Sequence, residues 1–239
     1  MSASDIIEIN GPGPVRWLPV ADASALRGVA YGRIIAAAVR AIADRDRFLL
    51  VLAGGDTPHD LYPMLRATDT DWSRWHIFYG DERCLPIDST ERTSRMTAYA
   101  WLNHVPIPPE QVHTIPAELG ALAAAQAYAD TLRGLGDFDL VLLGLGEDGH
   151  TASLFPGQDC GEEAGAPDTL AVLDAPKAPA ERVSLSAHRL SRAREVIFMV
   201  EGESKRAAVK LWRADGDIPA RLILPPTGVD VLLPAKLLN

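Results

Sequence analysis

Short apolar runs that alternate with longer amphipathic stretches limit this chain to few folds. Most of the runs are unbroken and bounded by Gly, Pro or Asp, which is typical of strands buried on both faces of a parallel sheet. The expected strands are Phe48–Ala53, Trp75–Tyr79, Phe138–Leu143, Leu170–Leu173, Arg182–Ser186, Val196–Val200 and Val229–Leu233. The expected helices are Ala21–Ala43, Pro58–Ala67, Glu91–Leu102, Leu119–Leu132 and Glu203–Ala214. This alternation predicts an α/β fold, a single Rossmann-like domain over residues 1–239 with a largely parallel central sheet flanked by helices.

The composition limits the classes of molecule that the chain is expected to bind. The 239 residues are 47% hydrophobic and carry a formal net charge of −9, which argues against a general affinity for nucleic acid or anionic membranes. The N-terminus lacks a leader pattern, and no apolar stretch approaches the ~20 residues of a membrane span. We therefore expect a cytoplasmic protein, a monomer or weak homo-oligomer, in which an anionic ligand would need a local basic pocket.

The cysteine and histidine spacings give no sign of a metal or a disulfide. Cys84 and Cys160 lie far apart and outside any CxxC pattern, and the six histidines show neither HxH nor HExxH spacing. The sequence predicts no metal site and no cofactor.

In α/β folds, ligands bind beyond the carboxyl ends of the strands, so the loops there are the candidates for chemistry. The first such loop is Gly54-Gly55-Asp56-Thr57, with Thr57 as the expected N-cap of a helix and Pro58 in its first turn. Paired glycines allow close approach of the backbone, and free amides at a helix start attract anions. The loop is a candidate phosphate site, although tight turns also use paired glycines for structural reasons alone.

Charged residues mark two further strand ends. Asp81, Glu82 and Arg83 follow the second expected strand, where the arginine would hold a carbonyl oxygen or a phosphate and Asp81 or Glu82 would orient it. Arg182 begins a strand, and Lys205, at a helix start, is a candidate to close on a phosphate as a point charge. Solvated surface charges are the alternative for the Asp81–Arg83 cluster and for Lys205.

The most informative segment is the glycine-rich run after the third expected strand. Gly144 to Gly149 match the GxGxxG dinucleotide pattern. We reject that interpretation because Glu147 and Asp148 would repel a pyrophosphate and Pro156 leaves little room for a helix. What remains is a histidine at a strand end.

That histidine is His150, next to Asp148. An unperturbed imidazole pKa of ~6.5 suits proton abstraction from water near neutral pH. No GxSxG elbow is present, so attack by water is simpler than a serine nucleophile. A lone histidine is more often structural, and we assign that role to the others, which are His59, His76, His104, His113 and His188.

Taken in order, these motifs resemble the 6-phosphogluconolactonase family, part of a wider group with glucosamine-6-phosphate deaminase. The matching segments are LAGGDTPHDLY, WHIFYGDERCLP, FDLVLLGLGEDGHTASLFPG, RVSLS and EGESKRAAV. The resemblance implies a Rossmann-like fold and hydrolysis of 6-phospho-glucono-1,5-lactone without metal or cofactor. It makes His150 the base that activates water, Asp148 its support and Arg83 the holder of the developing oxyanion.

The same resemblance implies that the 6-phosphate is held by Arg182, Lys205 and the Gly54–Thr57 loop. Asp56 departs from the family pattern, which often has serine or threonine there. The nearest rival function is that of an aminosugar-phosphate isomerase or deaminase. The motif of those enzymes resembles DEY where this chain has Asp81-Glu82-Arg83, and they have a glutamate where this chain has Phe155. A sugar-phosphate sensor is a second rival, and the stretch before Phe48 shows no helix-turn-helix pattern or basic patch to support it.

Overall fold

The computed structural model describes residues 6–7 and 13–238. Seven strands form the central sheet in the order β1-β2-β10-β9-β6-β3-β4, and every neighbouring pair is parallel except β1 with β2. These strands are β1 (Ile6–Ile7), β2 (Val15–Val20), β3 (Phe48–Leu52), β4 (Trp75–Tyr79), β6 (Leu140–Leu143), β9 (Val196–Met199) and β10 (Val229–Pro234). The largely parallel sheet expected from the sequence is confirmed.

A smaller antiparallel sheet lies beside the carboxyl ends of these strands. Its order is β5-β8-β7, with β5 (Asp81–Arg83), β7 (Thr169–Val172) and β8 (Arg182–Leu185). Only Gly80 separates β4 from β5, so the chain passes directly from one sheet to the other. A continuous cluster of buried apolar residues joins both sheets. The single domain over residues 1–239 stays a prediction.

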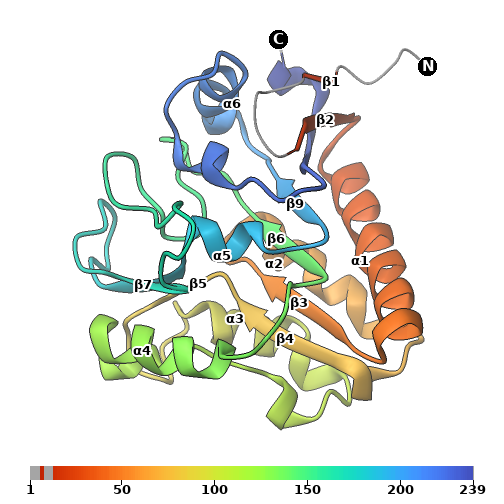
Figure 1. The fold of residues 1–239 in the computed structure, drawn as a ribbon. Helices are drawn as coiled ribbons and strands as arrows, with labels where there is room; N and C mark the ends of the chain where they lie inside the picture. The colour runs from red at the N-terminus through yellow and green to blue at the C-terminus, as the bar shows by residue number, and fades with distance from the viewer. Residues whose placement is uncertain (1–5, 8–12, 239) are drawn as a thin grey trace.

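Helices cover the sheets (Figure 1). The α-helices are α1 (Ala23–Arg45), α2 (Asp56–Leu61), α3 (Thr93–Ala100), α4 (Ala121–Leu132), α5 (Ala187–Ser191) and α6 (Arg206–Arg213). The 3₁₀ turns are η1 (Tyr62–Ala67), η2 (Trp72–Arg74), η3 (Leu102–His104), η4 (Pro109–Gln111), η5 (Ala117–Leu119), η6 (Glu203–Lys205), η7 (Pro219–Leu222) and η8 (Ala235–Leu238). Helix α1 packs on β3 and β10, and α4 packs on β7 and β8. Within the described ranges, no helix is long and apolar enough to cross a membrane.

The strands of the central sheet are straightforward to explain from their composition. All residues of β3, β6, β9 and β10 are buried, because helices or loops cover both faces of the sheet. Helix α1 buries a stripe at helical spacing, with Leu26, Ala30, Ile34 and Ala41 facing the sheet. Its N-cap is Asp22, whose carboxylate accepts the amide of Ala25 at 2.9 Å.

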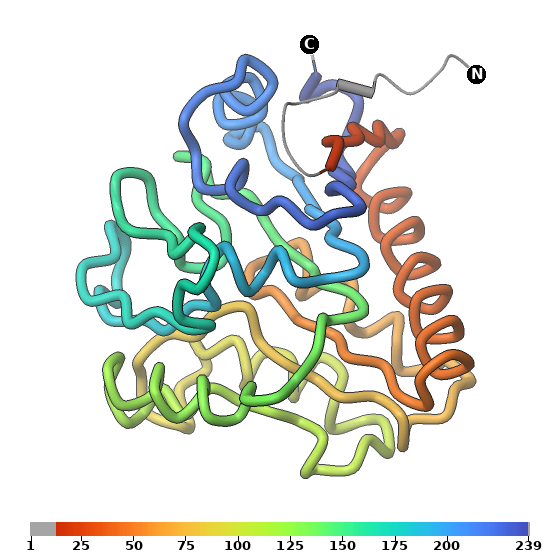
Figure 2. Tube along the Cα trace, in the orientation of Figure 1, coloured from red at the N-terminus to blue at the C-terminus, as the bar shows by residue number. Residues whose placement is uncertain are grey.

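Strand β2 was not expected from the sequence. Arg16 and Pro19 interrupt its apolar run, which hides the strand pattern. Arg16 is accommodated because its Nε lies 2.5 Å from Oδ1 of Asp230 on the adjacent strand β10. Figure 2 shows these two strands, from opposite ends of the described chain, side by side.

Two local expectations were wrong. The DER segment is strand β5 and not a loop, since Asp81 pairs with Ser184 and Arg83 with Arg182 across the small sheet. Helix α2 begins at Asp56 after an N-cap at Gly55, so Thr57 lies within the first turn and does not cap it. The φ of +96° at Gly55 explains why the helix starts there, because a side chain disfavours that conformation.

Candidate active site

A cavity of about 450 Å³ opens at the carboxyl ends of β3, β4 and β6. The cavity brings together eight of the ten site residues predicted from the sequence: Gly54, Gly55, Asp56, Asp81, Arg83, His150, Arg182 and Lys205. Its size suits a small ligand. Of the other two, Asp148 lies behind His150, and Thr57 lines an adjoining cavity with Asp60 and Glu201.

His150 and Asp148 form a hydrogen-bonded pair at the edge of this cavity. Nδ1 of His150 lies 2.5 Å from Oδ1 of Asp148, and the same oxygen accepts the backbone amide of His150 at 3.1 Å. The ionised carboxylate can only accept, so this contact requires a proton on Nδ1, and Nε2 is then the acceptor nitrogen of the neutral imidazole. About 21% of the His150 side chain is exposed, which makes it accessible to water.

Glycines make room for this pair. A Cβ at Gly146 would lie 2.0 Å from Nδ1 of His150 and 2.6 Å from Oδ1 of Asp148, so no other residue fits there. Gly149 has a φ of +88°, and a Cβ on it would meet Ile218 at 2.5 Å. No helix follows β6 in the described residues from Gly144 to Asp168, in agreement with our rejection of a dinucleotide site.

The pairing also sets the charge state of Asp148. Partial burial by itself would raise the pKa of this carboxyl, but the hydrogen bonds and positive potential from His150 outweigh burial and lower the pKa. Asp148 is therefore ionised at neutral pH and favours the imidazolium that His150 becomes when it accepts a proton.

Arg83 is held differently from our expectation. Its Nη1 donates to the carbonyl oxygen of Glu91 at 2.8 Å, and neither Asp81 nor Glu82 touches its guanidinium group in the described structure. Glu82 is fully buried, and it accepts the backbone amides of Arg83, Thr93 and Ser94 at 2.8–2.9 Å. Glu82 thus fixes the start of helix α3, which lines the cavity.

Asp81 faces the cavity from the first residue of β5. Its Oδ2 accepts the hydroxyl of Ser153 at 2.6 Å. Burial raises the pKa of Asp81, because the Ser153 hydrogen bond and the positive groups Arg182 and His150 compensate only in part for lost hydration. No local pattern identifies Ser153 as a site residue, since its partner lies 72 residues away.

Arg182 enters the cavity from β8 with its guanidinium supported from behind. Its Nε donates to the carbonyl of Pro179 at 3.1 Å and its Nη2 to that of Lys177 at 2.9 Å. Burial lowers the pKa of Arg182; Asp81 opposes this effect and Arg83 adds to it. Since Nη1 makes no hydrogen bond within the described structure, it is available to a ligand.

Packing alone explains a glycine in the Gly54–Thr57 loop. A Cβ at Gly54 would meet Oγ1 of Thr93 at 2.7 Å, so the close packing of α3 already requires glycine. Asp56 and Lys205 line both this cavity and the adjoining one. The phosphate-binding role of this loop therefore stays a prediction.

The acidic, histidine and cysteine side chains of the described residues do not converge on a metal site. Within residues 6–7 and 13–238, no group of three or more His, Cys, Asp or Glu side chains is arranged to hold a metal ion. Cys84 and Cys160 are both free thiols.

Comparison with known proteins identifies the family. The family described as glucosamine-6-phosphate isomerases/6-phosphogluconolactonase matches residues 21–232. The chain belongs to this family. Its motifs at β3, β4 and β6 are the ones that line the cavity, so the family resemblance and the geometry agree on the location of the site.

Relatives within the family carry the lactonase name. The chain is 38% identical to the human 6-phosphogluconolactonase over 217 residues, 84% of each protein. It is 38% identical to the Mycobacterium leprae 6-phosphogluconolactonase over 202 residues, 79% of this chain and 81% of the relative. The solved 6-phosphogluconolactonase of Trypanosoma brucei superposes with a TM-score of 0.81 at 27% identity, covering 92% of this chain and 96% of that one.

Proposed function

We propose that this protein hydrolyses 6-phospho-D-glucono-1,5-lactone to 6-phospho-D-gluconate, a step of the oxidative pentose phosphate pathway, by general-base activation of water. The observation that carries the proposal is the 2.5 Å contact between His150 and Asp148 at the edge of a cavity lined by Arg83, Arg182 and Lys205. The names of the family relatives support the same reaction.

The mechanism follows from the free Nε2 of His150. This nitrogen takes a proton from a water molecule as the water oxygen attacks C1 of the lactone, and Asp148 stabilises the resulting imidazolium. Arg83 stabilises the negative charge that develops on the carbonyl oxygen. When the bond between C1 and the ring oxygen breaks, His150 returns the proton to that oxygen, and the open acid is the product.

The phosphate supplies binding energy that positions C1. Arg182 and Lys205, with the backbone of the Gly54–Asp56 loop, form the proposed phosphate site. Neither Arg182 nor Lys205 has a carboxylate within 4 Å in the described part of the chain, so their positive charge is available to a dianionic ligand. Energy from this remote group favours the reactive geometry at C1.

An aminosugar-phosphate isomerase or deaminase is less well supported. The position where those enzymes have a glutamate holds Phe155, which is buried and packs against the His150 ring at a centroid distance of 4.9 Å. A ring-opening reaction would lack that carboxylate. The sensor alternative finds no support either, because the described residues before Phe48 form strands β1 and β2 and helix α1.

Acid release from freshly prepared lactone tests the proposal. Wild type should accelerate the release, and His150→Ala should lower kcat by roughly 10²–10⁴-fold with an unchanged melting temperature. His113→Ala is the matched control, because His113 stacks on Phe78 and does not line the cavity. Equal rates for His150→Ala and wild type would overturn the role of His150.

Three further expectations belong to this proposal. We expect the protein to reside in the cytoplasm, to bind no nucleic acid, and to be a monomer or weak homo-oligomer. Cell fractionation, a gel-shift assay and light scattering would test them in turn.

A further inference from the structure

Phe155 is an aromatic residue that touches two groups of the proposed site without lining the cavity. Its side chain is only 1% exposed. On one side its ring lies 4.9 Å from the His150 ring, centroid to centroid, at an interplanar angle of 45°. On the other side Cζ of Arg182 lies 5.8 Å from the Phe155 ring centroid. One ring thus contacts both the proposed base and a proposed phosphate ligand.

We propose that Phe155 is a positioning residue that fixes His150 and Arg182 relative to one another; this inference rests on the proposed function. The hydrogen bond to Asp148 restrains His150 at Nδ1 alone, which leaves the imidazole able to swing about that contact. The Phe155 ring limits this motion from the side. For Arg182, backbone carbonyls hold Nε and Nη2, and the ring of Phe155 adds a cation–π contact to the guanidinium group.

The distance between these two groups matters because the substrate bridges them. Its C1 must lie at His150 while its phosphate lies at Arg182, so a shift of either group misplaces the reacting carbon. Misplacement by about 1 Å lowers rates by as much as roughly 10²-fold. A shared packing partner couples the two positions in a way that separate hydrogen bonds do not.

The surroundings of Phe155 separate this role from general packing. Phe155 belongs to a small apolar cluster with Val172 and Ala175, distinct from the main core. Val172 does not line the cavity, and its backbone pairing with Arg182 across β7 and β8 does not depend on its side chain, so Val172→Ala loosens the same cluster without removing the aromatic ring. Phe155→Leu removes the ring but retains an apolar side chain, and Phe155→Tyr retains the ring.

The experiment measures kcat and KM separately for these variants with 6-phosphogluconolactone. We expect Phe155→Leu to lower kcat about tenfold and to raise KM about fivefold, Phe155→Tyr to restore most of both, and Val172→Ala to change neither by more than about twofold. In an Arg182→Ala background, Phe155→Leu should no longer raise KM but should still lower kcat. Equal effects of Phe155→Leu and Val172→Ala at equal melting temperatures would reduce Phe155 to a packing residue.

Calorimetry with 6-phosphogluconate distinguishes failure of this inference from failure of the proposed function. If wild type does not turn over the lactone, the proposed function is wrong, yet weaker binding of 6-phosphogluconate by Phe155→Leu would still support the positioning of Arg182. Equal affinities for wild type and Phe155→Leu would overturn that part of the inference.

Discussion

The central sheet has an amino edge, where its parallel strands begin, and a carboxyl edge, where they end. Both edges use Asp and Arg side chains, but in opposite ways. At the amino edge, the buried Asp139 accepts Nη2 of Arg45 and the amide of Leu49, both at 2.8 Å. At the carboxyl edge, Arg83 and Arg182 donate to backbone carbonyls, and neither has a carboxylate within 4 Å in the described structure. Carbonyls orient a guanidinium without cancelling its charge. The amino edge is therefore neutralised for stability, whereas the carboxyl edge keeps a positive charge for a ligand.

Asp230 extends the pattern at the amino edge. Its two oxygens meet Nε of Arg16 at 2.5 Å and Nη2 of Arg33 at 2.7 Å, and only 5% of its side chain is exposed. Asp81, at the opposite edge, has a hydroxyl partner in place of an arginine. Loss of hydration without a cationic hydrogen-bond partner makes ionisation costly, so the ionised form of Asp81 lowers stability.

Of the effects that test this contrast, the largest is expected at the carboxyl edge. Arg83→Gln should lower kcat by roughly 10²–10³-fold, since it removes the charged donor that we propose for the developing oxyanion, and should leave the melting temperature nearly unchanged. Initial rates of acid release measure this effect. Arg45→Gln is the control from the amino edge, and activity lost equally in both variants would refute the contrast between the edges.

The second prediction tests the amino edge. Asp139→Ala should lower the free energy of unfolding by about 2–3 kcal/mol, because it leaves the buried amide of Leu49 without an acceptor and removes the buried carboxylate that Arg45 contacts. Urea denaturation measures the loss. The value of kcat/KM should stay at the wild-type level under conditions in which the variant is folded, and a large fall in it would mean that this edge also serves the site.

The smallest expected effect is that of Asp81→Asn, which should raise the melting temperature. Because the folded protein raises the pKa of this carboxyl, wild type has its full stability below the unfolded pKa near ~4 and loses some as pH rises through the folded value. Asp81→Asn does not ionise, so it should melt roughly 2 °C higher than wild type at pH 8 and equally at pH 3.5. Thermal scans at the two pH values check this. A lower melting temperature at pH 8 would show that the charge of Asp81 is fully compensated.

Much of this architecture could be predicted from the sequence because parallel strands buried on both faces are unbroken apolar runs, as in β3 and β6. Strand β2 could not be predicted, because Arg16 interrupts the apolar pattern and its partner Asp230 on the adjacent strand is not known from the sequence. Strand β5 consists of charged residues whose pairing with β8 depends on tertiary contacts. Local propensity does not report such pairings.

The residues of the proposed site also fall into those that a local motif identifies and those that depend on tertiary contacts. His150, Asp148 and the glycines around them are neighbours in the sequence, so a motif was enough to find them. Ser153 and Phe155 act on partners from β5 and β8, and nothing in their local sequence specifies those partners. The orientation of Arg83 depends on the carbonyl of Glu91, an atom that every residue possesses and no pattern can predict.

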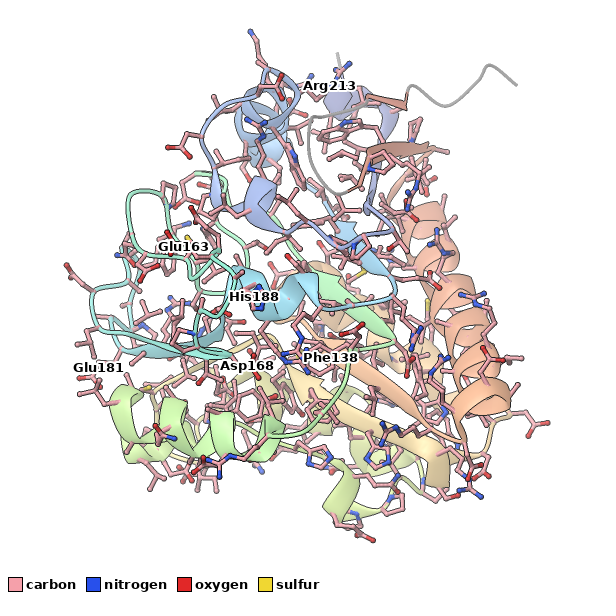
Figure 3. All side chains as sticks on the ribbon, viewed as in Figure 1. Phe138, Glu163, Asp168, Glu181, His188 and Arg213 are labelled. Atoms are coloured by element: carbon pink, nitrogen blue, oxygen red, sulfur yellow. The ribbon has the colours of Figure 1, made fainter. Side chains whose placement is uncertain are left out.

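The segment from residue 157 to 168 has a practical consequence. Backbone hydrogen bonds from Ala187 and His188 to Cys160 and Gly161 anchor its middle, and none of its residues lines the cavity. Beyond that anchor, residues 162–165 are exposed, and Figure 3 shows Glu163 on this outer loop. A peptide tag or reporter domain inserted between Glu163 and Gly165 would project into solvent, which offers a route to immobilise or label the protein without obstructing entry to the cavity.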